Sequence, residues 1–412
     1  MATRTIADGG GNYNSIGTWV EGAIPTSADD VVATGTSGAL TVTAAAAAKT
    51  LILTGYTNTL TINSGFTLTV SGDVTLANGM TYAGAGTLAI AATATLTANG
   101  VTVSGGLMLG TTTAMTMTLA DNWSVNGLLT TGAVSAFTYT INGNQLSAAT
   151  HWTHPGGIVS GTTIIALTGT GTWTTSGTAS RYCSNPISIN TTGTITLASN
   201  GPVLANNTVT YVSGTVVSTG STIRIVGNVT LNGSWPTLEN ITFGATCALT
   251  CDNNLTLSGK ILVPTSYTVT LAGLDFSCAT LGLEHNTSLK IPNSKTLTIT
   301  TGIETYRSAT ATSTISSTTA STSSTILYTG ATSGQKIVGA IFTDIIATNA
   351  LWNVFGGTLT RTSGVTNTSY LQGDYTDPGE AQVATGTSYL YQGATKNGSY
   401  AGGGSTVIVI ED

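Results

Sequence analysis

The chain has 412 residues, of which only 7% are charged, against roughly a quarter in an ordinary soluble domain. Its net charge is −6 and no lysine or arginine lies between Lys49 and Arg181, so nucleic acids and anionic membranes, which bind through basic residues, are not expected partners. The mean hydropathy is +0.26, yet threonine interrupts every apolar run before it reaches the ~18 residues that span a membrane, so folding must bury the apolar residues.

Residues 1–35 are predicted to form an N-terminal cap, because the end of a repeat stack must be covered. They contain Trp19, Pro25 and the pair Asp29-Asp30. Asx-turn or N-cap-like backbone bonding explains the two acids, and a calcium site is the alternative. The segment begins MATRTIADGGGNYNSIGTW, without a basic region followed by an apolar one. We therefore expect no secretory signal peptide and assembly in a cytoplasm.

Residues 36–330 repeat short units in which apolar residues alternate with threonine, the period of a β-strand. Glycine, Asn-Gly and Ser-Gly turn signals separate the units, and no helical periodicity is present. The clearest units are Leu40-Thr41-Val42, Leu60-Thr61-Ile62, Leu68-Thr69-Val70, Val74-Thr75-Leu76 and Val101-Thr102-Val103. Three units per coil give a period in the mid-twenties, which is typical of solenoid repeats. We predict an all-β fold, a parallel β-helix (β-solenoid), in preference to a sandwich, whose core usually stops growing before 300 residues.

In a β-helix, equivalent residues of successive coils stack at about 4.8 Å. Aliphatic residues are expected inside, and threonine outside, where it keeps strand propensity without adding apolar surface. Like charges at this spacing would repel, which explains why neutral side chains are preferred. The inward positions are predicted to include Leu60, Ile62, Leu68, Val70, Val74 and Leu76.

Carboxylates are sparse along the repeats, and this bears on catalysis. Glycoside hydrolysis usually needs two carboxylates roughly 5 to 9.5 Å apart. Asp73 and Asp121 are separated by about two coils, whereas Asp252 and Asp275, with Glu284 nearby, are about one coil apart. We interpret all five as turn residues at solvated corners and predict no catalytic residue, metal or cofactor.

Histidine and cysteine offer two further candidate sites. His151 and His154, in HWTHP, fall on opposite faces of a strand, and a surface turn before Pro155 is preferred to a zinc site. The four cysteines form no CxxC pair, and cytoplasmic assembly disfavours disulfides. We expect them to be buried like small apolar residues, Cys251 and Cys278 in one ladder because they are near one coil apart. The cysteines are Cys183, Cys247, Cys251 and Cys278.

The C-terminal fifth of the chain differs in composition. Residues 331–369 are predicted to be a distal β-rich segment, and residues 370–412 a module that mediates assembly. Its last strand, STVIVI, is apolar on both faces, which suits pairing with another chain. The alternative is that this strand folds back as a cap. The assembly residues are Thr406, Val407, Ile408, Val409 and Ile410, and the tyrosines that could contact sugars or a partner are Tyr375, Tyr389, Tyr391 and Tyr400.

The stretch WVEGAIPTSADDVVATG resembles the start of β-helical surface proteins of tailed bacteriophages, through Trp19, Gly22, Pro25, Asp30 and Val31. The following KTLILTGYTNTLTINSGFTLTVSGDVTL is similar to their repeats. VGAIFTDIIATNALWNVFGGTLTRTSGV and DPGEAQVATGTSYLYQGATKNGSY resemble C-terminal elements of such proteins. The resemblance implies a virion surface protein, and it carries over no catalytic residue.

Three functions are compatible with these features. The leading hypothesis is a non-enzymatic structural virion protein, a head decoration, spike or fibre on the phage surface. It would form a homotrimer in the host cytoplasm with other capsid or tail proteins as partners, and host surface glycans are a candidate contact. A polysaccharide-depolymerising tailspike is the alternative, which the sparse carboxylates disfavour. A bacterial adhesin or ice-binding solenoid is the third, but its turns are too uneven for one flat threonine face.

Overall fold

The computed structural model describes residues 2–111, 113–132, 134, 137–284, 286–305 and 313–318. Beyond these it describes strands only, at 324–328, 335–338, 340–343, 345–348, 352–355, 369–372, 375–376, 386–391, 396–397 and 405–410. In the described chain every regular element is a strand, apart from the 3-10 turn η1 (Ile16–Thr18). The chain forms two compact units, Met1–Val217 and Ser218–Asp412, and parallel strand pairing builds both. The predicted parallel β-helix is confirmed.

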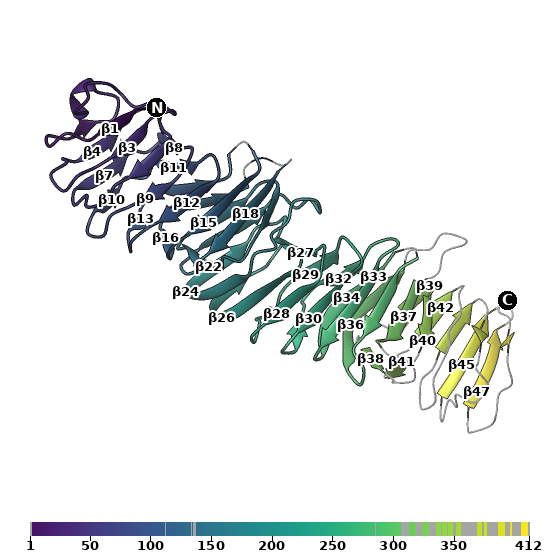
Figure 1. Ribbon diagram of the computed structural model, residues 1–412. Coiled ribbons are helices and arrows are strands. Elements are labelled where there is room, and N and C mark those ends of the chain that lie inside the picture. The colour runs from purple at the N-terminus through teal and green to yellow at the C-terminus, as the bar shows by residue number, and fades with distance from the viewer. Residues whose placement is uncertain are drawn as a thin grey trace. The chain divides into compact units, whose positions relative to one another are not determined.

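In the first unit the strands stack into ladders on three sides of the coil (Figure 1). The first side contains β1 (Thr3–Thr5), β3 (Asp30–Val32), β6 (Thr50–Ile52), β9 (Val74–Thr75), β12 (Ala94–Thr97), β15 (Met115–Leu119), β18 (Thr138–Gly143) and β21 (Ile158–Ser160). The second contains β2 (Gly11–Asn12), β4 (Leu40–Val42), β7 (Thr59–Ile62) and β10 (Thr81–Ala83), then β13 (Thr102–Val103), β16 (Trp123–Val125), β19 (Leu146–Ala148) and β22 (Ile165–Leu167).

The third side contains β5 (Ala46–Ala48), β8 (Thr67–Val70), β11 (Thr87–Ile90), β14 (Gly106–Leu109), β17 (Leu128–Thr131), β20 (His151–His154) and β23 (Gly171–Thr175). The long strands β24 (Ile187–Leu197) and β26 (Asn207–Val217) pair with each other, and β24 continues the second and third sides together. The short β25 (Val203–Leu204) completes the unit. Residues that face each other on adjoining coils lie 27 positions apart for Thr3 and Asp30 but 20 for Asp30 and Thr50, so the coil length varies and the predicted mid-twenties period lies within its range.

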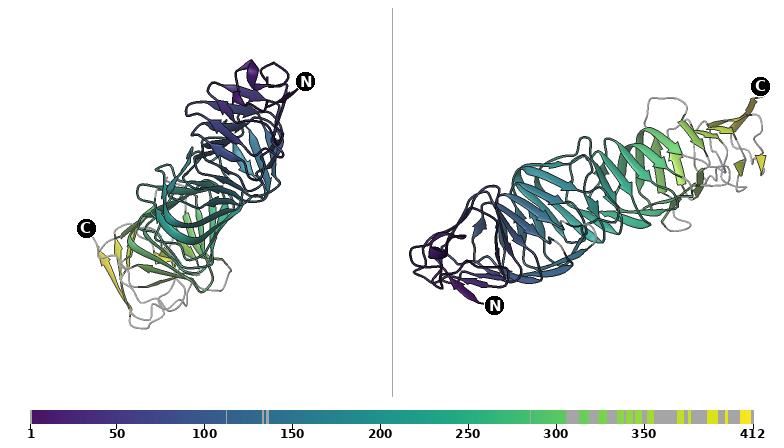
Figure 2. Two further views of the ribbon diagram at one scale, coloured as in Figure 1. Left: turned by 90° about the vertical axis from the view of Figure 1, so that its left-hand side faces the viewer. Right: turned by 90° about the horizontal axis from the view of Figure 1, so that it is seen from above.

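The second unit repeats this construction, as Figure 2 shows from two further directions. One ladder contains β27 (Thr222–Ile225), β29 (Asn240–Phe243), β32 (Lys260–Val263), β34 (Phe276–Leu283), β36 (Thr296–Thr305), β38 (Ser324–Tyr328) and β41 (Ile345–Thr348), with β31 (Leu255–Thr256) also paired to β34. A second contains β28 (Val229–Asn232), β30 (Cys247–Cys251), β33 (Thr268–Gly273), β35 (Ser288–Ile291), β37 (Ser313–Ser317) and β40 (Ala340–Thr343).

The C-terminal strands of this unit form a five-stranded parallel sheet and a separate strand pair. The sheet contains β39 (Gln335–Val338), β42 (Trp352–Phe355), β43 (Ser369–Gln372), β45 (Gly386–Tyr391) and β47 (Ser405–Ile410). The pair is formed by β44 (Tyr375–Thr376) and β46 (Lys396–Asn397).

The core of each unit is a set of stacked aliphatic and aromatic rows. All six predicted inward residues of the 60–76 stretch are fully buried, whereas the threonines between them are partly exposed. Three tryptophans, Trp123, Trp152 and Trp173, are also buried, and the last two stack with ring centroids 5.1 Å apart. Burying one such side chain stabilises the fold by about 2 kcal/mol.

A corner of the first unit is built from glycines because adjoining coils touch there through their backbones. Gly105 is the example: a Cβ at this position would lie 2.1 Å from the carbonyl oxygen of Gly86. A Cβ at Gly127, one coil further on, would lie 2.3 Å from the carbonyl oxygen of Gly105. The turn signals of the sequence therefore mark a corner whose close approach excludes side chains.

Residues 1–35 contribute strands to the same ladders as the repeats that follow. β1 pairs with β3, and β3 pairs in register with β6. The two compact units divide at Val217, in the middle of the predicted 36–330 body. The boundaries at 35, 330 and 369 remain predictions.

Candidate functional site

Asp73 and Asp121, the first candidate acids, bind the same coil from opposite sides. Asp73 Oδ1 accepts a hydrogen bond from the Thr95 N–H at 2.7 Å. Asp121 accepts from the N–H groups of Ala98 and Asn99 at 2.7 and 2.5 Å. Both carboxylates therefore satisfy backbone donors of the intervening coil, Asp73 within β12 and Asp121 just after it.

The acids of the second unit act in the same way but point to different coils. Asp252 Oδ1 accepts from the Gly233 N–H at 2.8 Å, 19 residues earlier in the chain. Asp275 Oδ1 accepts from the Thr296 N–H at 2.8 Å, 21 residues later. Asp252 and Asp275 thus bond in opposite directions along the stack. The interpretation as turn residues agrees with these contacts.

Glu284 Oε2 accepts two hydrogen bonds from Thr265, one from the N–H and one from the hydroxyl, both at 2.9 Å. This carboxylate therefore also joins two neighbouring coils, because Thr265 lies 19 residues earlier. All five candidate acids now have a structural contact of the same kind.

Neutral side chains make the same contact at other turns. Asn122 Oδ1 accepts from the Gln145 N–H at 3.1 Å, and Thr93 Oγ1 accepts from the Thr116 N–H at 3.1 Å. Asn228 Oδ1 accepts from Ala248 N–H at 2.9 Å. We call these bonds, with those of the acids, corner staples: a side-chain oxygen of one coil accepts a backbone N–H of the next or previous coil.

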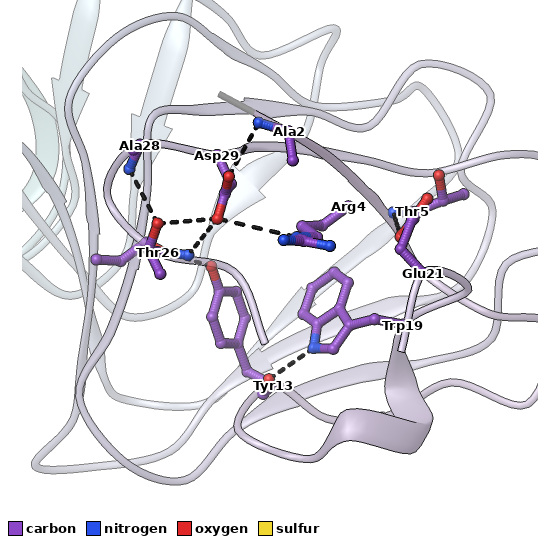
Figure 3. A network of polar contacts seen from close by, with 10 residues as sticks. Ala2, Arg4, Thr5, Tyr13, Trp19, Glu21, Thr26, Ala28 and Asp29 are labelled. Carbon is purple, nitrogen blue, oxygen red and sulfur yellow. Dashed lines mark hydrogen bonds and ion pairs between the residues drawn. The ribbon is translucent and has the colours of Figure 1, made fainter. Parts of the chain in front are cut away.

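Asp29 is the centre of a polar network at the N-terminal end (Figure 3). Its carboxylate accepts hydrogen bonds from the Ala2 N–H at 3.0 Å, and from the N–H and hydroxyl of Thr26 at 3.0 and 2.8 Å. Arg4 Nε lies 3.8 Å from Oδ2. The Thr26 hydroxyl, then the backbone donors, hold the pKa of Asp29 below its usual value.

The predicted backbone bonding of this acid pair is confirmed for Asp29, with one correction. Its donors precede it in the chain, whereas an Asx turn or N-cap bonds to residues that follow. Asp30 instead accepts from the Thr50 hydroxyl at 2.8 Å and pairs with Lys49 at 3.7 Å. Among the residues that the structure describes, no group of three His, Cys, Asp or Glu side chains is placed to hold a metal.

An aromatic pair beside this network covers the outer edge of β5. Tyr13 and Trp19 pack edge to face with centroids 5.0 Å apart, and Trp19 Nε1 donates to the Tyr13 carbonyl at 2.8 Å. The Tyr13 hydroxyl donates to the Ala47 carbonyl at 2.6 Å, and Asn14 Nδ2 to that of Ala45 at 3.4 Å. Burial raises the pKa of Tyr13. The side chains of Tyr13 and Asn14 thus donate hydrogen bonds to β5-edge carbonyl groups, which could otherwise accept hydrogen bonds from an added strand.

His151 and His154 lie on opposite faces of β20, as predicted, but the expected surface turn is wrong. The segment is a ladder strand, His151 is exposed, and His154 is fully buried. Because β20 pairs with β17 and β23, its alternation continues the core through His154.

Both ring nitrogens of His154 lie 3.1 Å from a carbonyl oxygen, Nδ1 from that of Thr131 and Nε2 from that of Gly157. Burial lowers the pKa of His154 to about 4, so the ring is neutral near pH 7. A neutral ring has one N–H, which can be on Nε2 and donate to the Gly157 carbonyl. Nδ1 then accepts a hydrogen bond from the Thr131 hydroxyl, 3.5 Å away. The same hydroxyl accepts from Trp152 Nε1 at 2.9 Å. The alternating pattern was the signal for this buried network, which sequence reasoning missed.

The four cysteines are free and buried, as expected. The predicted ladder of Cys251 and Cys278 is wrong, because the two belong to different sheets. Cys251 in β30 pairs with Gly273, and Cys278 in β34 pairs with Ile299. Burial raises the pKa of both thiols to about 12, so neither forms a thiolate near neutral pH.

The predicted assembly strand pairs with its own chain. All six residues of β47 are in register with β45, with Tyr389 opposite Ile408 and Tyr391 opposite Ile410. This pairing agrees with the fold-back alternative on one edge of the strand. β47 is the last strand in the order of its sheet, so its other edge has no ladder partner among the described strands. Tyr375 lies in β44, opposite Lys396, and Tyr400 lies outside the described residues.

Comparison with known proteins gives no relative: no family, curated protein or solved structure matches the chain. In the described part, no helix is long and apolar enough to cross a membrane.

Proposed function

We propose that the chain is a non-enzymatic structural protein of a phage particle surface, a head decoration, spike or fibre, assembled as a homotrimer with other virion proteins. The observation that carries this proposal is the use of its carboxylates as corner staples, at Asp73, Asp121, Asp252 and Asp275. A glycosidase needs one carboxyl group to give a proton and a second to attack or to activate water. The solenoid uses its acids to hold coils together instead.

The two ends of the chain support the same proposal. At the N-terminal end, Tyr13 and Asn14 occupy edge carbonyls of β5. At the C-terminal end, β47 keeps one edge without a described ladder partner. An open edge can pair with a strand of another subunit through backbone hydrogen bonds and without charge. This difference supports assembly through the C-terminal strand.

Two measurements on the full chain test the proposal. Electron microscopy of intact particles from the source culture, labelled with an antibody against the purified protein, should place it on the particle surface. The purified protein should release no reducing ends from host capsule or lipopolysaccharide. Asp73→Asn, Asp252→Asn and Asp275→Asn should leave particle attachment unchanged. Reducing ends that disappear in one of these variants would establish the depolymerase, and unlabelled particles would refute the virion role.

A further inference from the structure

A row of buried polar side chains lies beside the second side of the first unit. Its members are Thr163, Asn185 and Asn207, each 22 residues after the one before. Each stands two positions before a residue that pairs between β22, β24 and β26. The three residues are buried, with exposed fractions of 0, 0 and 8%. This polar row therefore occupies the same place in three successive coils.

The amide nitrogens of the polar row bind backbone carbonyls of earlier coils. Asn185 Nδ2 donates to the carbonyl oxygens of Thr163 and Ile141, both at 3.0 Å. Asn207 Nδ2 donates to those of Asn185 and Cys183, both at 3.2 Å. Each amide side chain therefore lies directly against the preceding member of the row.

These bonds also determine how the two amides are oriented. Turning either amide over would place Oδ1, which only accepts hydrogen bonds, against two carbonyl oxygens, which also only accept. The nitrogen of each amide must therefore face the carbonyls. The amide oxygens of Asn185 and Asn207 lie on the other side of their groups, away from these carbonyls.

Three buried oxygens of the polar row have no hydrogen-bond partner among the residues that the structure describes. They are Asn185 Oδ1, Asn207 Oδ1 and the Thr163 hydroxyl. A buried polar group left unpaired loses its hydration without compensation, so native proteins almost always pair such groups with protein or with ordered water. The polar row therefore needs a further group that donates to its two amide oxygens.

Two comparable side chains show how the protein itself can pair such groups. Asn240 Nδ2 donates to a carbonyl of the preceding coil at 3.2 Å, and its Oδ1 accepts a backbone N–H of the following coil at 2.8 Å. Thr191 is buried like Thr163, and its hydroxyl donates to the Gly169 carbonyl at 3.0 Å and accepts from the Gly193 N–H at 2.9 Å. The polar row differs because protein groups satisfy only its amide nitrogens.

We propose that the polar row binds internal water molecules, which donate to Asn185 Oδ1 and Asn207 Oδ1 and accept from the Thr163 hydroxyl. Equivalent atoms of adjoining coils repeat at ~4.8 Å, so a water ~2.8 Å from two such oxygens can donate one hydrogen to each. Buried water typically makes about three hydrogen bonds to polar groups that lack other partners. The two amide oxygens and the hydroxyl supply that set.

A monovalent cation is the competing ligand, because it would also bind neutral oxygens. The polar row contains no carboxylate, and the residues two positions further on are buried aliphatic ones, Ile165, Ile187 and Val209. A charge moved into such surroundings loses far more hydration free energy than a few neutral oxygens return. The row therefore favours water, which needs no neutralising charge.

Thr163→Val tests whether the hydroxyl is hydrogen-bonded, because valine keeps the shape of threonine without the hydroxyl. If water binds, the variant loses a hydrogen bond, and its unfolding equilibrium constant should rise by about threefold to tenfold. Thr191→Val is the matched control, since it removes hydrogen bonds that the structure shows. Thr163→Val should lower the guanidinium midpoint by at least half as much as this control. A smaller loss, or a gain in stability from removing an unpaired hydroxyl, would overturn the proposal.

A high-resolution crystal structure of the full-length protein, grown in rubidium chloride, identifies the ligand. We expect density at roughly 2.7–3.2 Å from Asn185 Oδ1 and Asn207 Oδ1, without a rubidium anomalous signal. A rubidium signal beside the polar row, or no density there, would refute the water sites. The inference goes beyond the proposed function, and neither measurement depends on a role in the virion.

Discussion

The glycine corner gives the sharpest test of how the coils are held together. A Cβ at residue 105 would lie 2.1 Å from the Gly86 carbonyl oxygen, where ordinary contact begins near 3.4 Å. Gly105→Ala therefore requires the coils to move apart by roughly 1 Å, and overpacking of this kind costs about 1–3 kcal/mol. The hydrogen bond from the Gly106 N–H to the Gly86 carbonyl, 2.9 Å long, would be stretched, at a cost of about 1 kcal/mol. We expect the free energy of unfolding to fall by about 2–4 kcal/mol.

Gly17→Ala is the matched control, because nothing lies within 4 Å of a Cβ at residue 17 and its φ is not in the left-handed region. It should change stability by less than about 0.5 kcal/mol, as surface substitutions usually do. Guanidinium unfolding of both variants, followed by far-ultraviolet circular dichroism, measures the difference. A Gly105→Ala protein as stable as Gly17→Ala would show that the coils do not approach as closely as described.

Three further predictions concern acid and protease. The pKa of His154 is about 4 in the folded protein and near 6.5 when unfolded, so stability should be complete above pH 6.5 and fall by about 3 kcal/mol as pH falls to 4. Denaturant midpoints across this range should lose that slope in His154→Gln but keep it in His151→Gln. Because the pKa of Asp29 is lowered, its contribution is present above the unfolded pKa and lost as pH falls through the folded value. Hydrogen exchange near residues 2–6 should therefore rise below about pH 4, and rise at pH 7 in Asp29→Asn; unchanged exchange in that variant would contradict the network. Native trypsin should leave the body uncut, because ladder hydrogen bonds protect the few cleavable residues it contains, and rapid cleavage after Arg181, Arg224 and Lys260 in the native protein would refute this.

The sequence predicted the fold class and the core positions because both follow from a period of two. Leu60 and Ile62 are buried since they alternate with threonine, and no distant information is needed to see this. His154 obeys the same alternation, but its polarity and the following proline suggested a turn. A buried histidine is acceptable here only because Thr131 and Gly157 supply hydrogen-bond partners. Those partners are 23 and 3 residues away, and the coil register decides whether they meet it.

Strand register also explains why the predicted ladder of Cys251 and Cys278 is wrong. Cys251 and Cys278 differ by about one coil in sequence, yet turns of unequal length place them on different sides of it. The coil length itself varies, with staples spanning 19 residues at Asp252 and 23 at Asp121. Assuming a constant period therefore predicts where strands lie, but it does not predict which side chains of different coils are neighbours.

The scarcity of charge follows from what polar side chains do in this fold. At each stapled turn an oxygen accepts a backbone N–H of an adjoining coil, and the neutral Thr93 and Asn122 do so at 3.1 Å where Asp73 does so at 2.7 Å. A neutral acceptor satisfies the donor without placing like charges about 4.8 Å apart along a ladder. Acids are tolerated where the neighbouring staple is neutral: Asn254 accepts from the Asp275 N–H, and Asp275 in turn accepts from Thr296. Hydroxyl and amide groups thus replace charge at many turns because coils repeat so closely, and Asp275, whose neighbouring staple is the neutral Asn254, shows how a carboxylate is accommodated among them.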